Sequence, residues 1–322
     1  MKTVIITGAM GFIGSHTAKL FKQYGYRVIG VDRAETIPQA AQYLDQWLRD
    51  DYVTMTPIAA TENDVSTIIH CAGSSLLGPS VKDPHTYYSN NSYGTSELLQ
   101  ELHDRGWHGH IVFSSSAATY GIIPESRPLV EGDRQWPINP YGWSKLFCEQ
   151  IIRDHCTAHG FTAVLLRYFN AAGADPEGTL GHTAEDTHLI PRILSAHWNK
   201  KKFDLYGADY NTHDGTCIRD YLHVMDIAEA HYQAMRLVSD MNTGQCSAYN
   251  LGTGTGYSNG EVFKKCSEVV GKNIKFRVLD RRPGDPDELV ASSMKFQKVT
   301  GWQPKYDLDS IVRTAWNWQQ KR

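Results

Sequence analysis

The chain has 322 residues, of which 41% are hydrophobic and 21% are charged, and its formal net charge is −3 at pH 7. This is the composition of an ordinary globular protein with one large or two modest domains, without the charge bias that would favour nucleic acid or a membrane surface as a partner. No apolar run approaches the roughly 18 residues that a membrane span needs. The six cysteines form no CxxC pair, so we expect reduced thiols in the cytoplasm, with neither a disulfide framework nor a metal site.

Short apolar runs rich in β-branched residues recur in the first half of the chain, with helical stretches between them. The first run is too short and too rich in glycine for a signal peptide, and it fits a buried strand. Continuous rather than alternating apolar character is expected of strands buried on both faces, so the pattern predicts an α/β fold with a doubly wound parallel sheet of Rossmann type. The predicted strands are Lys2–Gly8, Arg27–Asp32, Ser66–Gly73, His110–Ser116 and Ala163–Asn170, and the helices are about Gly14–Tyr24, Tyr88–Asp104 and Tyr141–His159.

Beyond Asn170 the sequence becomes dense in Gly, Asp, Pro and Thr, which indicates the start of a smaller second lobe. The run Ala248–Gly254 has the apolar character of a strand and predicts a return to the first sheet. We therefore expect interleaved domains, the first formed by residues 1–172 and about 220–254, the second by about 173–219 and 255–322.

The segment TGAMGFIGSH places Gly8, Gly11 and Gly14 as GxxGxxG between the first strand and the first helix. Glycines there allow a tight turn and a close approach of the backbone to a pyrophosphate, which the N–H groups of the helix N-terminus bind. Asp32 closes the second strand, where a carboxylate can bind the ribose hydroxyls of adenosine and repel a 2′-phosphate. Arg33 would accommodate that phosphate, so the pattern favours NAD over NADP without deciding between them.

Tyr141 and Lys145 stand four residues apart just after Pro140, so they share one face of the predicted helix. A cation beside a phenol favours the phenolate and lowers its pKa from about 10. Such a pair would provide a general base that works at neutral pH. The alternative is an amphipathic helix that carries both residues by coincidence.

The GxxGxxG spacing, FSSSAATYG after the fourth strand and Tyr141-x-x-x-Lys145 together resemble the extended short-chain dehydrogenase/reductase family. The second half resembles the UDP-glucose 4-epimerases of that family, in order and nearly end to end, in Leu166–Gly178, Glu185–Leu194, Leu205–His231, Tyr249–Ser258 and Arg281–Ser293. The resemblance implies that NAD binds the first domain and that the catalytic residues are Ser116, Tyr141 and Lys145. It implies that NAD contacts Gly8, Gly11, Phe12, Ile13, Gly14, Asp32, Arg33, Ala72, Gly73, Asn91, Ser114, Tyr141, Lys145 and Tyr168.

By the same resemblance, a UDP-hexose binds to Ser116, Tyr141, Asn170, His188, Leu189, Tyr206, Arg219, Arg282, Asp285 and Leu289. Guanidinium groups suit a diphosphate, although Arg219 could instead pair with Asp220 and Arg282 could be a surface charge. The implied reaction starts when Tyr141, as phenolate, removes the proton of the sugar 4-hydroxyl with the help of Ser116. The C4 hydride passes to NAD⁺ and returns to the other face of the 4-keto sugar after that sugar has turned over, so no net redox occurs.

Other functions remain open. A nucleotide-sugar 4,6-dehydratase needs a carboxylate pair after the Ser-rich strand end, where this chain has Ala117, Ala118 and Thr119. An epimerase of UDP-N-acetylhexosamines or of another nucleotide sugar is the main alternative, because Leu289 falls where the family limits the room beside the hexose 2-substituent. A non-catalytic NAD(H)-binding sensor on the same fold would usually lack the Tyr/Lys pair.

The chain departs from these epimerases between residues 33 and 66, which are too few for the usual segment beside the adenine. About nine residues remain between Ile58 and Ser66, and a full crossover helix hardly fits there. We take Thr56 or a neighbour to stand in place of the family's acid. This predicts a trimmed adenine pocket from which NAD leaves more easily.

The segment Thr86–Gly106 and the Tyr141 helix resemble the helix pair that forms a four-helix bundle across a homodimer in related proteins. Apolar residues such as Leu98, Leu102, Phe147 and Ile151 would contribute to this bundle, or would face only the sheet. We expect a homodimer.

Overall fold

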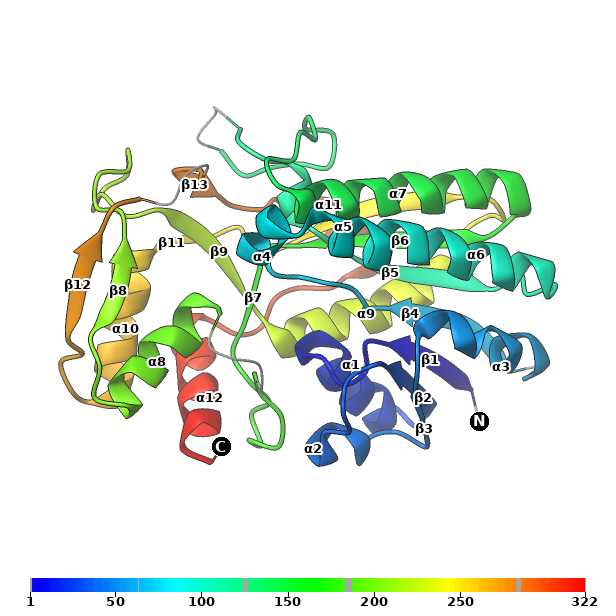
Figure 1. Cartoon of the computed structure of the whole chain (residues 1–322), viewed down its shortest axis with the longest axis horizontal. Coiled ribbons are helices and arrows are strands. Elements are labelled where there is room, and N and C mark those ends of the chain that lie inside the picture. The colour runs from blue at the N-terminus through cyan, green and yellow to red at the C-terminus, as the bar shows by residue number, and fades with distance from the viewer. Residues whose placement is uncertain (1, 63, 124–126, 183–186, 282–284, 322) are drawn as a thin grey trace.

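A computed structural model describes residues 2–62, 64–123, 127–182, 187–281 and 285–321. Its largest element is a seven-stranded sheet in the order β10-β6-β5-β4-β1-β2-β3, in which every pairing is parallel (Figure 1). The strand order reverses between β1 and β4, and in open α/β sheets ligands bind at the carboxyl ends of the strands beside such a point. The strands are β1 (Thr3–Thr7), β2 (Arg27–Asp32), β3 (Gln46–Arg49), β4 (Val65–His70), β5 (His110–Ser116), β6 (Thr162–Tyr168) and β10 (Cys246–Leu251).

Helices cover both faces of this sheet. No helix among the described residues is both long and apolar enough to cross a membrane. The helices are α1 (Phe12–Gln23), α2 (Pro38–Ala41), α3 (Thr56–Thr61), α4 (Leu77–Lys82), α5 (Pro84–Tyr87), α6 (Gly94–Asp104), α7 (Pro140–His159), α8 (Leu189–Trp198), α9 (Val224–Ser239), α10 (Asn259–Val270), α11 (Met294–Thr300) and α12 (Leu308–Lys321). A π-helical turn at Tyr88–Tyr93 precedes α6, and 3₁₀ turns lie at Tyr52–Met55 and Ala117–Thr119.

The alternating sides of one strand explain why the apolar runs are continuous. Val4 and Ile6 of β1 belong to the core cluster with residues of α1 and α9. Ile5 belongs to the cluster on the opposite face, with residues of α6 and α7. Both faces are therefore buried, and the predicted doubly wound parallel fold is confirmed.

A smaller group of elements lies beside the sheet, at the left of Figure 1. β8 (Phe203–Tyr206) pairs with β12 (Phe276–Leu279), and α8, α10 and α12 form a separate core with β8. Between this group and the large sheet, β9 (Ile218–His223) pairs with β7 (Asn170–Ala172), β11 (Gly256–Ser258) and β13 (Glu288–Leu289). The chain then returns to the large sheet in β10, as the apolar run Ala248–Gly254 predicts.

The helix that carries Tyr141 has strong local start and stop signals. The side chain of Asn139 accepts a hydrogen bond from the backbone N–H of Gly142 at 2.9 Å, and Pro140 is the first helical residue. Gly160 ends the helix in the left-handed conformation, with φ +76°. The predicted helix Tyr141–His159 is thus confirmed with a start one residue earlier.

Two expectations for the segment 33–66 need revision. A six-residue helix, α3, follows the 3₁₀ turn Tyr52–Met55, so the crossover to β4 is helical but short. The strand β3, which the sequence does not predict, adds an edge to the sheet beside β2.

The apolar residues of α6 and α7 divide between the core and the surface. Leu98 and Leu102 lie in the core against the sheet, and Ile151 packs against the same cluster. Phe147 is 43% exposed. Of the residues predicted for a dimer bundle, only Phe147 faces outward.

Candidate active site

Two adjoining cavities open at the carboxyl ends of the parallel strands. The larger has a volume of about 990 Å³ and extends from the ends of β1 and β2 to those of β5 and β6. The smaller, of about 200 Å³, lies between α8, β8 and β9. Lining residues common to both, among them Phe12, Asn170, His188, Arg219 and Asp285, join the cavities into one site.

The glycine loop forms one wall of the larger cavity. Gly8 has φ +70°, and a Cβ on it would lie 2.8 Å from the backbone nitrogen of Ala72, so the ends of β1 and β4 cross at a distance that only glycine permits. A Cβ on Gly14 would lie 2.1 Å from the carbonyl oxygen of Gly8. Gly11 is the N-cap residue of α1, whose first turn contains no acidic residue, and Gly11, Phe12, Ile13 and Gly14 all line the cavity. The N-terminus of α1 is therefore suited to bind an anion.

Asp32 and Arg33 lie at the β2 end of this cavity. The Asp32 carboxylate accepts hydrogen bonds from the backbone N–H groups of Met10 and Ala34, both at 3.0 Å, which fixes its direction. The Arg33 guanidinium lies 3.5 Å from the carboxylate of Asp51. Both side chains are at the cavity, as the sequence predicts.

The acid beside Asp32 is Asp50, and the assignment of Thr56 to that place is wrong. Asp50 directly follows β3, its backbone N–H donates to the carbonyl of Asp32 at 3.1 Å, and it lines the cavity together with Tyr52. Thr56 is buried at 1% exposure and accepts a hydrogen bond from Arg105 at 3.1 Å. The error arises because the sequence does not predict β3, which brings the chain to the cavity several residues before Thr56.

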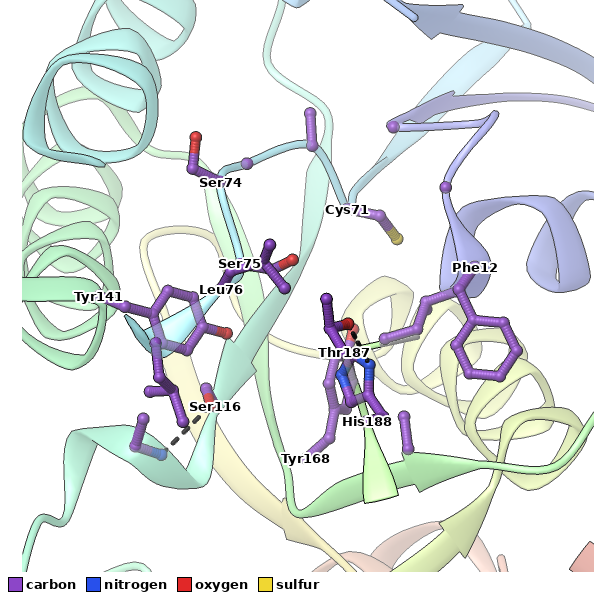
Figure 2. A pocket seen from close by; sticks show the side chains of 18 of the residues that line it. Phe12, Cys71, Ser74, Ser75, Leu76, Ser116, Tyr141, Tyr168, Thr187 and His188 are labelled. Carbon is purple, nitrogen blue, oxygen red and sulfur yellow. Dashed lines mark hydrogen bonds between the residues drawn. The ribbon is translucent and has the colours of Figure 1, made fainter. Parts of the chain in front are cut away.

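Ser116 and Tyr141 meet at the other end of the cavity (Figure 2). Ser116 ends β5, and its Oγ accepts a hydrogen bond from the backbone N–H of Ala118 at 3.1 Å. Tyr141 enters from the first turn of α7, and it lines the same cavity as Ser116. A substrate hydroxyl placed here would contact both oxygens.

Lys145, Ser114 and Asn91 lie directly behind the cavity wall. Lys145 is 5% exposed, and its Nζ donates a hydrogen bond to the Ser114 carbonyl at 2.9 Å. A Cβ on Gly73 would be 3.5 Å from this Nζ, so glycine leaves the ammonium close to the cavity. The backbone N–H of Ser74 donates a hydrogen bond to Oδ1 of Asn91 at 2.8 Å, which ties the wall to the π-helical turn before α6.

The predicted effect of Lys145 on Tyr141 is wrong for this structure. Burial raises the pKa of Tyr141, and the influence of the Ser116 side chain lowers it only in part. Burial also lowers the pKa of Lys145, whose Nζ lies 4.7 Å from the centre of the Phe113 ring. Desolvation is the largest cause of both shifts, and neither side chain is among the groups that shift the pKa of the other.

The predicted substrate residues gather around the junction of the two cavities. Asn170, His188, Arg219, Asp285 and Leu289 line the larger cavity, and Leu189 and Tyr206 line the smaller. Arg219 is 8% exposed and lies 3.3 Å from Asp285. Arg282 lies outside the described residues.

Arg219 does not pair with its neighbour Asp220. The carboxylate of Asp220 accepts hydrogen bonds from the backbone N–H groups of Thr253 at 2.9 Å and Gly254 at 3.0 Å. Its oxygens are therefore turned to the β10–β11 connection. The guanidinium of Arg219 remains at the cavity, where an anion can reach it.

Several residues that line the cavities are not among those predicted from the sequence. Ser74, Ser75, Leu76 and Leu77 follow β4 and line the larger cavity, and His182 lines both cavities with its ring 5.3 Å from that of Phe12. These residues belong to no motif. The carboxyl end of a predicted central strand could have pointed to the first four, because that edge of a parallel sheet binds ligands.

Comparison with known proteins identifies the family of the chain. The model of the NAD dependent epimerase/dehydratase family matches residues 4–252. The chain belongs to this family. It is 42% identical to the UDP-glucose 4-epimerase of Halalkalibacterium halodurans over 327 residues, which cover 99% of this chain and 96% of that protein.

Two solved structures extend this result. The UDP-glucose 4-epimerase of Bifidobacterium longum, in complex with NAD⁺ and UDP, superposes with a TM-score of 0.90 at 36% identity and covers 99% of this chain and 98% of that one. The UDP-Glc/GlcNAc 4-epimerase of Campylobacter jejuni gives a TM-score of 0.84 at 33% identity, with both chains covered completely. The resemblance to UDP-glucose 4-epimerases stated from the sequence is thus confirmed.

Proposed function

We propose that the protein interconverts UDP-glucose and UDP-galactose with NAD⁺ as a bound hydride store. The observation that carries this proposal is that the cavity with Ser116 and Tyr141 in its wall continues, at Asn170, His188 and Arg219, into the smaller cavity. The larger cavity has the features of a dinucleotide site, and Arg219 lies where the two cavities meet, at the place where a diphosphate would enter. The structure of the epimerase from Bifidobacterium longum contains two such ligands, NAD⁺ and UDP.

The residues present fit NAD⁺. The closely crossing glycine loop, the uncharged first turn of α1 and the oriented carboxylate of Asp32 suit a pyrophosphate and a ribose. When bound, NAD⁺ supplies the atom that accepts the hydride from the sugar C4 and later returns it. The first predicted domain would bind this cofactor, and the second would bind the UDP-sugar.

The chain's own residues would accept the proton of the sugar 4-hydroxyl and would orient the nucleotide of the substrate. Tyr141, in its phenolate form, takes the proton from the sugar 4-hydroxyl, while Ser116 donates a hydrogen bond to the same oxygen. Arg219 binds the diphosphate, and Tyr206 lines the cavity for the base. Because this grip is on the nucleotide, the 4-keto hexose is free to turn over and present its other face.

A second candidate substrate is a UDP-N-acetylhexosamine. Leu289 lines the larger cavity and packs against a cluster that includes Ala117, Tyr120 and Phe169. A leucine leaves more room beside the hexose than an aromatic side chain would. The Campylobacter jejuni neighbour is a UDP-Glc/GlcNAc 4-epimerase, which favours acceptance of both substrates.

We also propose a homodimer formed through the α6–α7 side. Tyr93 is 61% exposed, Trp136 57% and Phe147 43%. The ring of Trp143 links those of Trp136 and Phe147, at 5.4 and 5.6 Å between centroids. Aromatic surfaces of this kind are enriched in interfaces. All six cysteines are free thiols, which supports a cytoplasmic location. The proposed interconversion of UDP-glucose and UDP-galactose would give the enzyme a role in galactose metabolism.

The function is tested by incubating the purified protein with UDP-galactose or UDP-N-acetylgalactosamine, with and without added NAD⁺, and separating the products. We expect the 4-epimer of UDP-galactose without net NADH. A dependence on added NAD⁺ would support the easily released cofactor that the short 33–66 segment predicts. If neither sugar gives a 4-epimer while the Tyr141→Phe variant behaves identically, the protein is not a 4-epimerase of these sugars.

A further inference from the structure

A buried histidine lies beneath the reaction end of the larger cavity. His231 of α9 is fully buried, and its Nε2 is 2.8 Å from the hydroxyl of Tyr168, 3.4 Å from Oγ of Ser114 and 3.8 Å from Sγ of Cys71. These three residues come from the ends of the neighbouring strands β6, β5 and β4. Tyr168 and Cys71 line the cavity, where Figure 2 labels them, and His231 lies behind them.

The hydrogen bonds of His231 determine which ring nitrogen carries the proton. Nδ1 lies 2.9 Å from the carbonyl oxygen of Ile227, which can only accept, so Nδ1 is the protonated nitrogen. Burial lowers the pKa of His231 to about 4, so the ring is neutral near pH 7. Nε2 is therefore a hydrogen-bond acceptor only.

The three side chains around Nε2 have one proton more than they can pair among themselves. Ser114 is hydrogen-bonded to the hydroxyl of Tyr168, and its Oγ lies 3.1 Å from Sγ of Cys71. The three side chains form an open chain of hydrogen bonds with Ser114 in the middle. Its two hydrogen bonds, to Tyr168 and to Cys71, use two of the three hydroxyl and thiol protons. Nε2 of His231 accepts the third. Without this acceptor, one hydroxyl or thiol proton would lack a partner and could turn toward the cavity.

We propose that His231 is a positioning residue for the oxidised cofactor, because it keeps the floor of the cavity free of unpaired protons. The inference rests on the proposed function, since the hydride acceptor must lie beside Ser116, which is the cross-strand neighbour of Tyr168. The nicotinamide ring of NAD⁺ carries a positive charge, whereas that of NADH is neutral. A proton directed at the ring would therefore weaken the binding of NAD⁺ more than that of NADH.

The test compares the affinities for NAD⁺ and NADH, measured by calorimetry on the purified full-length protein. His231→Leu removes the acceptor, His231→Asn is too short to reach Tyr168, and His231→Gln retains an acceptor. We expect the ratio of NAD⁺ to NADH affinity to fall about fivefold in the first two variants and to remain near the original value in His231→Gln.

The control is His223→Gln at the last residue of β9, directly before α9, because His223 is equally buried but its Nε2 faces Thr314 at 3.0 Å. It should leave the affinity ratio unchanged. An equal loss of both affinities in His231→Leu, an unchanged ratio, or failure of both removal variants to fold would overturn the inference. If the unsubstituted protein binds neither cofactor, the proposed function itself fails.

Discussion

The helix that carries the proposed base is fixed to the sheet by a buried ion pair that should dominate its stability. Glu149 lies one turn beyond Lys145, and its carboxylate binds Arg167 of β6 through Nε at 2.9 Å and a terminal nitrogen at 2.7 Å. Both side chains are 2% exposed. Ser115 donates a further hydrogen bond to Glu149 at 2.5 Å, and Arg167 donates one to Tyr120 at 2.9 Å.

Glu149→Gln would leave the guanidinium of Arg167 buried without a counter-charge, which typically costs about 3–5 kcal/mol. Arg167→Met, combined with Glu149→Gln, removes both charges, so the double variant should lose at least about 2 kcal/mol less than the sum of the two single losses. The free energy of unfolding is measured in urea at one protein concentration, because dimerisation would otherwise change it.

The matched control is the exposed pair of Glu101 and Arg105 in α6, which are 3.1 Å apart and more than 40% exposed. Glu101→Gln should cost less than about 1 kcal/mol. If Glu149→Gln costs no more than Glu101→Gln, or if the losses of the double variant simply add, the buried pair does not hold α7 as described.

Three further predictions concern the proposed base and the response to acid. Tyr141→Phe should lower the epimerisation rate about 10²–10⁴-fold with unchanged NADH affinity, as measured by product analysis and calorimetry. Burial raises the pKa of Tyr141, and the phenolate is the reactive form, so kcat/KM should rise with pH from about 7 to 9. Ser116→Ala should move this rise to higher pH, because Ser116 lowers the pKa of Tyr141. A flat profile would exclude a phenolate base. Four buried histidines are neutral in the folded protein, among them His70, whose pKa burial lowers to about 3. Below pH 6.5 the unfolded chain therefore binds more protons than the folded protein. Each of these histidines should lower the free energy of unfolding by about 2 kcal/mol between pH 7.5 and pH 5. Urea unfolding should show a smaller loss for His70→Gln and an unchanged one for the exposed His108→Gln, and equal losses in both would contradict this assignment.

The large sheet and the loop before α1 could be predicted because their signals are local. A strand such as Thr3–Thr7 is apolar on both faces, and the glycines after it meet a backbone constraint that leaves a mark at fixed positions. Tyr141 and Lys145 could be predicted for the same reason, since one helix sets their spacing.

The features that were missed depend on distant parts of the chain or on weak patterns. The edge strand Gln46–Arg49 is only partly buried and has no continuous apolar run, so the sequence does not predict it. Without this strand, the position beside Asp32 is assigned to Thr56 instead of Asp50. The pKa of Tyr141 depends on burial by several elements, which no spacing within α7 reports. The contact of His231 with Tyr168 joins residues 63 positions apart and has no sequence pattern.

The most direct test of the account follows the hydrogen at the sugar C4. UDP-glucose labelled with deuterium at C4 is incubated with the protein in ordinary water, and the UDP-galactose formed is analysed by mass spectrometry and NMR. A hydride that is stored and returned within the site predicts that the deuterium is retained at C4 of the product. Product that has lost the label to water, or the absence of UDP-galactose, would contradict the proposed hydride store.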